Sequence, residues 1–385
     1  MPDNNVFNPE CITFSQMNLL FNARIYFRRL TIWVWAYIIS RYYGIGSPQD
    51  LFSRLYLESM EISNMLTFVF GREYSQQYSE LLSDFSIGLS DLITAQLEGN
   101  AAEVNNVVDR MYDNVAIRAA FLEELNPYWN AEQYREYFGV YLTYIFEIIN
   151  SIIAGDFTKI IQTFDLLNDH TNLMGDQSAQ GMYYYITSGV GTDYEAMGNV
   201  PCITYDEVNQ IYQVKMVWFE LATWTRNYLL SEFIGVGAQD EVFERLRHVF
   251  DNYVNTMREI YGDEFANESQ EVLYGYLDLL RAYIDAQVRG DEEELNRLIP
   301  LLYENADRRA ALIASVNPIW DEEEWRNRQN NNIRYTIEEA VSFLSEDYAR
   351  NIGIYSRLID LAESTSNYLA IGLFDHFFSQ RISNP

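Results

Sequence analysis

The chain carries very little positive charge. Its 385 residues include 26 Lys and Arg against 56 Asp and Glu, a net charge of −30, and only Lys159 and Lys215 are lysines. Because nucleic-acid affinity comes mainly from Lys and Arg that displace counterions, this balance excludes nucleic acid as a partner. An anionic membrane surface is disfavoured for the same reason. A protein partner or self-association remains.

Cysteine and histidine are also scarce. The two cysteines, Cys11 and Cys202, precede the first predicted helix and lie in a predicted linker. We interpret the two as unrelated by the internal repeat, so no disulfide framework is expected. None of the three histidines stands in the Glu-x-x-His motif that holds two metals in an acidic helical bundle. We therefore predict no bound metal and no cofactor, with surface or rim positions for His170, His248 and His376.

Long apolar runs are missing as well. The most apolar run, from Leu30 to Ser40, covers 11 residues and is flanked by arginines, whereas a membrane-spanning helix needs about 20. No basic segment followed by an apolar core and a small-residue cleavage site opens the sequence. We therefore expect no membrane insertion and a cytoplasmic location.

What the sequence does contain is an internal repeat. Trp33 matches Trp224 when the chain is shifted by 191 residues, and the same shift without a gap aligns the residues from Asn18 to Met182 with the second half. Roughly a quarter of these positions are identical. Duplication explains this self-similarity. Glycines and an Asn-Pro-x-Trp segment, at Asn126 and again at Asn317, are among the repeated features.

The composition fits two globular domains. Hydrophobic residues make up 48% and aromatic residues 15% of the chain, which is enough for a core in each half. We expect a tail over residues 1–17, a first copy over 18–182, a linker over 183–206 and a second copy over 207–385. The predicted linker contains Gly189, Gly191, Gly198 and Pro201.

Helix-terminating signals divide each copy into six helices. Gly can adopt the left-handed conformation just past a helix end, whereas Asn, Asp and Ser cap helix starts. Alternation typical of strands is absent. The predicted fold is all-α, with two tandem antiparallel bundles of the ferritin-like or four-helix-bundle type. The first helix is expected over 18–43, and the expected helix-ending glycines of the first copy are Gly44, Gly71, Gly99 and Gly181.

Polar residues retained in both copies are the candidates for a site. One interpretation is structural, because buried polar groups need hydrogen-bond partners. The other is a small-ligand pocket lined by Ser40, Arg54 and Asn114 in the first copy and by Ser231, Arg245 and Asn305 in the second. Further retained pairs are Asn64 with Asn255, Arg118 with Arg309, Glu147 with Glu338 and Asp169 with Asp360.

The second copy resembles a family of small bacterial all-helical proteins of unknown function. The resemblance rests on Trp224-Thr225-Arg226 with Ser231, Arg245-Leu246, Gly262, Asn305-Ala306-Asp307, Asn317-Pro318 with Trp320, and Gly372. Relatives in that family are mostly single-copy, and many are labelled acetylglutamate kinase. Several carry inward histidines, and the matching positions here hold Phe85 and Tyr276.

Kinase activity is not expected. Such enzymes need an α/β sheet, glycine-rich phosphate loops and lysines near the phosphates, and this chain has helices and two lysines. The leading hypothesis is a non-enzymatic structural or protein-interaction protein built as a fused pseudo-dimer. The alternative is a small-ligand-binding or metal-binding bundle. A cavity lined by retained polar residues favours the alternative, and filled cores favour the leading hypothesis.

Overall fold

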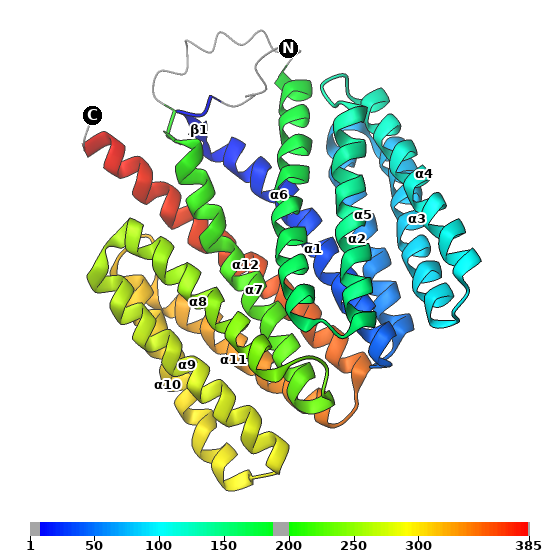
Figure 1. The fold of residues 1–385 in the computed structure, drawn as a ribbon. Coiled ribbons are helices and arrows are strands. Elements are labelled where there is room, and N and C mark those ends of the chain that lie inside the picture. The colour runs from blue at the N-terminus through cyan, green and yellow to red at the C-terminus, as the bar shows by residue number, and fades with distance from the viewer. Residues whose placement is uncertain (1–7, 188–199, 384–385) are drawn as a thin grey trace. The chain divides into compact units, whose positions relative to one another are not determined.

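The structure is a computed structural model that describes residues 8–187 and 200–383. Within these ranges it contains twelve helices and two short strands, so the prediction of an all-α protein is confirmed. The chain divides into two compact units, Met1–Cys202 and Ile203–Pro385, called here the first and second unit. The helices of both units are labelled in Figure 1.

The first unit contains six helices. Each packs against the next in the sequence, and the last also packs against the first. A strand, β1 (Ile12–Thr13), precedes α1 and pairs with β2 (Cys202–Ile203), where the first unit ends. The helices are α1 (Phe14–Tyr43), α2 (Pro48–Phe70), α3 (Arg72–Leu97), α4 (Ala101–Leu125), α5 (Ala131–Ala154) and α6 (Phe157–Thr187).

The second unit also contains six helices with the same neighbour packing, the last again lying against the first. Its first helix additionally packs against the third and fifth. The helices are α7 (Tyr205–Ile234), α8 (Gln239–Tyr261), α9 (Asp263–Arg289), α10 (Glu292–Ser315), α11 (Glu322–Leu344) and α12 (Tyr348–Ser383).

The first helix of each unit is the centre of its core. Most residues of α1 and of α7 are buried, on every side of the helix, and they include Trp33 and Trp224. A helix that is apolar all round belongs inside a protein. The run from Leu30 to Ser40 is therefore core.

Local signals in the sequence set most helix ends. Gly44, Gly71 and Gly99 have positive φ at or beside the ends of α1, α2 and α3, as predicted. The start of α1 was predicted too late, because the helix begins at Phe14. Thr13 caps it by accepting a hydrogen bond from the backbone of Gln16, whose side chain bonds back to Thr13.

The prediction that Gly181 and Gly372 end the last helix of each unit is wrong. Both lie inside helices, because α6 continues to Thr187 and α12 to Ser383. A β-carbon built at Gly181 would stand 2.0 Å from Trp129 Cδ1, and one at Gly372 would stand 2.1 Å from Trp320 Nε1. These glycines therefore let an indole ring lie against the helix backbone, and they do not terminate the helix.

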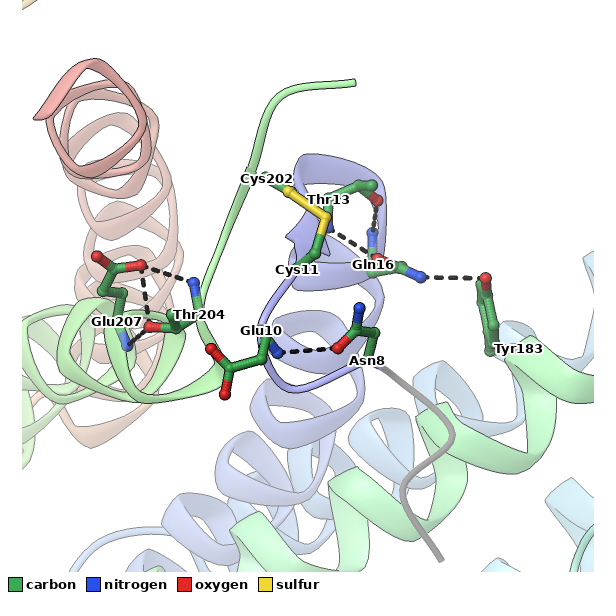
Figure 2. The surroundings of a disulfide bond; sticks show 9 residues. All are labelled: Asn8, Glu10, Cys11, Thr13, Gln16, Tyr183, Cys202, Thr204 and Glu207. Carbon is green, nitrogen blue, oxygen red and sulfur yellow. Dashed lines mark hydrogen bonds between the residues drawn. A yellow bond between two sulfur atoms is a disulfide. The ribbon is translucent and has the colours of Figure 1, made fainter. Parts of the chain in front are cut away.

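The expectation that the repeat does not relate the two cysteines, and that they form no disulfide framework, is wrong. Cys11 and Cys202 form a disulfide bond with Cα atoms 5.1 Å apart, and they are separated by 191 residues, the offset of the repeat. Figure 2 shows the bond beside the caps of α1 and α7, formed by Thr13 with Gln16 and by Thr204 with Glu207. The sequence repeat therefore extends back to Cys11.

The predicted linker, 183–206, overlaps two helices, because α6 includes residues 183–187 and α7 begins at Tyr205. Its glycines, Gly189, Gly191 and Gly198, lie outside the described residues. Part of the predicted tail, residues 1–7, lies outside them too.

One helix in the described part of the chain, α5, is long and apolar enough to span a membrane. Its most apolar window has a mean hydropathy of 1.4, and 44% of that window is buried. The helix packs against α4 and α6 inside the first unit. A core helix of a soluble protein has the same properties, so this helix is weak evidence for a membrane.

Candidate ligand cavity in the second unit

A half-open cavity of about 40 Å³ reaches into the core of the second unit. Five helices contribute to its wall, and most of the wall is apolar or aromatic. The polar side chains in the lining are those of Ser269, Arg309 and Gln329, and the Trp218 indole and the Tyr253 phenol add an N–H and a hydroxyl group. The remaining lining residues are Val217, Leu221, Phe250, Phe265, Val272, Leu273, Leu312 and Ile313.

Arg309 lies on α10, one helical turn after Asn305. The Asn305 amide donates a hydrogen bond of 2.9 Å to the carbonyl of Val272 on α9, which ties the two helices together beside the cavity. The Arg309 guanidinium lies over the ring of Tyr276, 4.5 Å from its centre. The helices α9 and α10 also supply seven of the residues that line the cavity. The two helices that carry Tyr276 and Arg309 therefore form much of the cavity wall.

The Arg309 side chain is buried without an anionic partner among the described residues. Its exposed fraction is 5%, and both Nε and Nη2 lack a hydrogen-bond partner. Burial lowers the pKa of Arg309 to about 10, with the phenols of Tyr276 and Tyr253 opposing the change. The group therefore stays charged at neutral pH. A buried charge without a partner is costly.

Other polar groups at the cavity also lack partners. Gln329 is 4% exposed, and its Oε1 makes no hydrogen bond within the described residues. The Nε1 group of Trp218 is likewise buried without an acceptor. A mostly apolar hollow with a few polar side chains in its lining is the usual form of a small-molecule site, and here the unpartnered atoms of Arg309, Gln329 and Trp218 lie behind the surface of the hollow.

The corresponding positions in the first unit carry larger side chains. Arg118 stands 191 residues before Arg309, but Tyr78 stands at the position of Ser269 and Phe138 at that of Gln329. The Tyr78 phenol lies near the Arg118 guanidinium, which opposes the rise in the pKa of Tyr78 that burial causes. The Phe138 ring lies 4.4 Å from the Arg118 guanidinium carbon. Aromatic side chains of the chain itself therefore surround this arginine, whose Nε, like that of Arg309, has no hydrogen-bond partner among the described residues.

The three site residues predicted in the first unit make contacts within that unit. Ser40 donates a hydrogen bond to the carbonyl of Ile45. Arg54 forms an ion pair with Glu58. Asn114 donates a hydrogen bond of 2.8 Å to the carbonyl of a residue on α3, Leu81. The structure does not bring these three side chains together around the cavity described above, which belongs to the second unit.

The three residues predicted in the second unit behave similarly. Ser231 donates a hydrogen bond to the carbonyl of Tyr228. Arg245 forms an ion pair of 3.0 Å with Glu220 and lies over the Trp224 ring. Neither these two residues nor Asn305 lines the cavity. A ligand-binding role for the six residues stays a prediction.

Sequence reasoning had one signal for the cavity. Both copies retain an arginine, at positions 118 and 309, but Arg309 is not among the six residues predicted to bind a ligand. Ser269 and Gln329 gave no such signal, because a site present in one unit alone is invisible to a search for residues retained in both.

A buried ion pair lies elsewhere in the second unit. Arg226 Nη1 is 2.6 Å from Glu339 Oε1 and donates a second hydrogen bond to Asn351. Burial raises the pKa of the Glu339 carboxyl to about 7, although Arg226 opposes the rise. The positions 191 residues earlier hold Trp35 and Ile148, which are apolar. This pair is specific to the second unit.

The titratable residues give no metal site in the described ranges, where no group of three or more His, Cys, Asp or Glu side chains is placed to hold an ion. The prediction of surface or rim histidines is wrong for His170, which is buried and hydrogen-bonded to the carbonyl of Tyr137. His248 is exposed beside Asp251, and His376 contacts Tyr261. The absence of a bound metal or cofactor stays a prediction.

Comparisons with protein-family models, with curated proteins and with solved structures found no match to this chain. The arrangement around Arg309 must therefore be interpreted from its own chemistry. It offers a buried cation, an amide and a small apolar volume. These groups can hold a small molecule, and they include no nucleophile placed beside a general base.

Proposed function

We propose that the chain is a non-enzymatic binding protein that holds a small molecule in the core of its second unit. The observation that carries this proposal is the cavity lined by Arg309, whose buried Nε and Nη2 have no partner in the described part of the chain. Since buried polar groups in proteins are almost always hydrogen-bonded, we infer a ligand that supplies the acceptors once the Arg309 side chain turns toward the cavity, because neither nitrogen is exposed to it as it stands.

The proposal also gives the first unit a structural role. We propose that both units are copies of one helical bundle and that the chain is a fused pseudo-dimer. In support, each of the six helices of the second unit begins 191 residues after the corresponding helix of the first. The copies then differ in use, because Tyr78 and Phe138 occupy the positions of the two cavity residues Ser269 and Gln329. The finer assignment to a ferritin-like or four-helix-bundle type stays a prediction.

No kinase activity is proposed. The resemblance to small bacterial helical proteins, some of them labelled acetylglutamate kinase, supports only the bundle and gives no mechanism. Lys215, one of the two lysines, is buried and donates hydrogen bonds to Ser366 and Asn367 within its own unit. We propose a protein partner or self-association for the surface, and no nucleic acid, given the net charge of −30.

A fragment screen by ligand-observed NMR tests the binding function. The wild-type chain is mixed with neutral and anionic molecules of about two to six heavy atoms, the size that a small cavity can admit. The control variant combines Ser269→Tyr with Gln329→Phe, which copies the side chains of the first unit. We expect some fragments to bind the wild type and to lose binding in the variant. Equal signals from both proteins would show that the cavity binds nothing.

A further inference from the structure

We propose that the cavity of the second unit is a site for one short monocarboxylate per chain, of about the size of acetate, held by the Arg309 guanidinium. The proposal rests on the proposed binding function and adds the chemical class and the stoichiometry of the ligand.

The donors of Arg309 that lack partners match a carboxylate. Elsewhere in the chain, Arg24 donates from Nε to one oxygen of Asp176 at 2.6 Å and from Nη2 to the other at 2.8 Å. The same two nitrogens of Arg309 are buried and have no acceptor within the described residues. A planar guanidinium edge binds a carboxylate through two parallel hydrogen bonds, which neither a halide nor a neutral amide can accept in the same way.

The rest of the cavity limits the ligand to one negative charge. Apart from Ser269, Arg309, Gln329, the Trp218 N–H and the Tyr253 hydroxyl, the lining is formed by apolar side chains and aromatic rings. A second charge in such a wall would be desolvated without compensation. The chain also has a net charge of −30, so its long-range field disfavours the approach of polyanions more than that of a monoanion.

Size gives the third restriction. The volume of about 40 Å³ is far below the several hundred Å³ of sites for drug-sized molecules. It admits a carboxylate with a short alkyl group, whose carbon atoms would contact side chains such as Phe250 and Phe265 in the lining. Nε and Nη2 of Arg309 are both buried, so binding includes a turn of the Arg309 side chain toward the anion.

The first unit explains why the stoichiometry is one. There the Tyr78 phenol lies near Arg118, and the Phe138 ring packs on the same guanidinium. In the second unit the corresponding residues are Ser269 and Gln329, and the space beside Arg309 is not filled by aromatic side chains at these two positions. Arg118 therefore provides a matched control for Arg309, with the same residue type in a helix that begins at the same repeat position.

The test uses carbon-13 NMR titrations of labelled acetate with the full chain, in buffer free of other carboxylates and of halides. We expect wild type and Arg118→Met to bind one acetate per chain. Arg309→Met should weaken binding by at least about tenfold, because a charged partner is lost from a desolvated site. The double variant Ser269→Tyr with Gln329→Phe should also lose binding, and it decides the result if Arg309→Met does not fold.

Acetamide and chloride, at matched ionic strength, separate the possible failures. If acetamide binds wild type as tightly as acetate does, or if chloride displaces acetate at equal concentration, the carboxylate assignment is wrong while the binding function survives. Unchanged acetate affinity in Arg309→Met, or two equal sites per chain, would also overturn it. If neither acetate nor any fragment of the wider screen binds, the proposed function fails as well.

Discussion

Trp129 packs directly onto the backbone of Gly181, so that a β-carbon on this glycine would lie 2.0 Å from Trp129 Cδ1. The turn before the tryptophan holds the same glycine, because the Asn126 side chain donates a hydrogen bond of 2.9 Å to the Gly181 carbonyl. In the second unit Asn317 donates one of 2.8 Å to the carbonyl of Gly372. The Asn-Pro-x-Trp segment is thus a clamp on the last helix of each unit.

Alanine at the clamped glycines should destabilise the protein. We expect Gly372→Ala to lower the free energy of unfolding by about 1 to 3 kcal/mol, the usual cost of overpacking. The matched control is Gly353→Ala on the same helix, where a β-carbon would meet nothing within 4 Å. Because Ala is the better helix former by up to about 1 kcal/mol, the control should be neutral or stabilising. Denaturant unfolding of both variants checks the difference.

Removing Trp129 should destabilise the protein, and it should also remove the clash that a β-carbon at position 181 would otherwise meet. Trp129 is 2% exposed, and its Nε1 donates a hydrogen bond to the carbonyl of Ser178. We expect Trp129→Ala to cost about 3 to 5 kcal/mol, as for other buried aromatic residues. Adding Gly181→Ala to Trp129→Ala should then cost much less than Gly181→Ala alone. Additive losses in this double-mutant cycle would mean that the two residues do not interact as described.

The sequence was sufficient for features that depend on neighbouring residues. Gly44 takes a left-handed conformation and Ser47 caps α2 because each requirement is local. Gly181 was misread because a glycine inside a helix and a glycine after one look alike in sequence. Only the approach of Trp129, from the turn between α4 and α5, distinguishes them.

The cavity depends on contacts that no local pattern encodes. The arginines at 118 and 309 are alike in sequence, and each lies in the fourth helix of its unit. They differ because Tyr78 reaches one and the shorter Ser269 stands by the other, which becomes visible only when α3 and α9 are placed in their bundles. The disulfide is different, because the 191-residue separation of Cys11 and Cys202 was readable from the sequence.

Stability should depend on pH through Glu339. Burial raises the pKa of its carboxyl from 4.5 to about 7, so the folded state holds this proton more tightly than the unfolded state. The contribution is fully present below pH 4.5 and is lost as the pH rises through about 7. The free energy of unfolding of wild type, relative to Glu339→Gln, should therefore fall by on the order of 3 kcal/mol over this range. A flat difference would show that the carboxyl titrates normally.

The disulfide should contribute to stability through the loop that it closes. Cys11 and Cys202 enclose a loop spanning 191 residues, and loop-closure entropy gives up to about 5 kcal/mol for a bond of this span. We expect Cys11→Ser to lower the melting temperature, and Cys202→Ser to lower it equally, because either change removes the same bond. The double variant should lose nothing further. A reductant that leaves the wild-type melting curve unchanged would contradict this role.

The same bond tests the expected location of the protein. Disulfides persist in oxidising compartments and are rare in the cytosol, whereas the sequence alone led us to expect a cytoplasmic protein. Thiol alkylation immediately after cell lysis, followed by mass spectrometry, reports the state of both cysteines. Because the structure bonds Cys11 to Cys202, we expect them to be protected from alkylation until a reductant is added. Full alkylation without reductant would place the chain in a reducing compartment. The disulfide between Cys11 and Cys202 would then be absent in the cell.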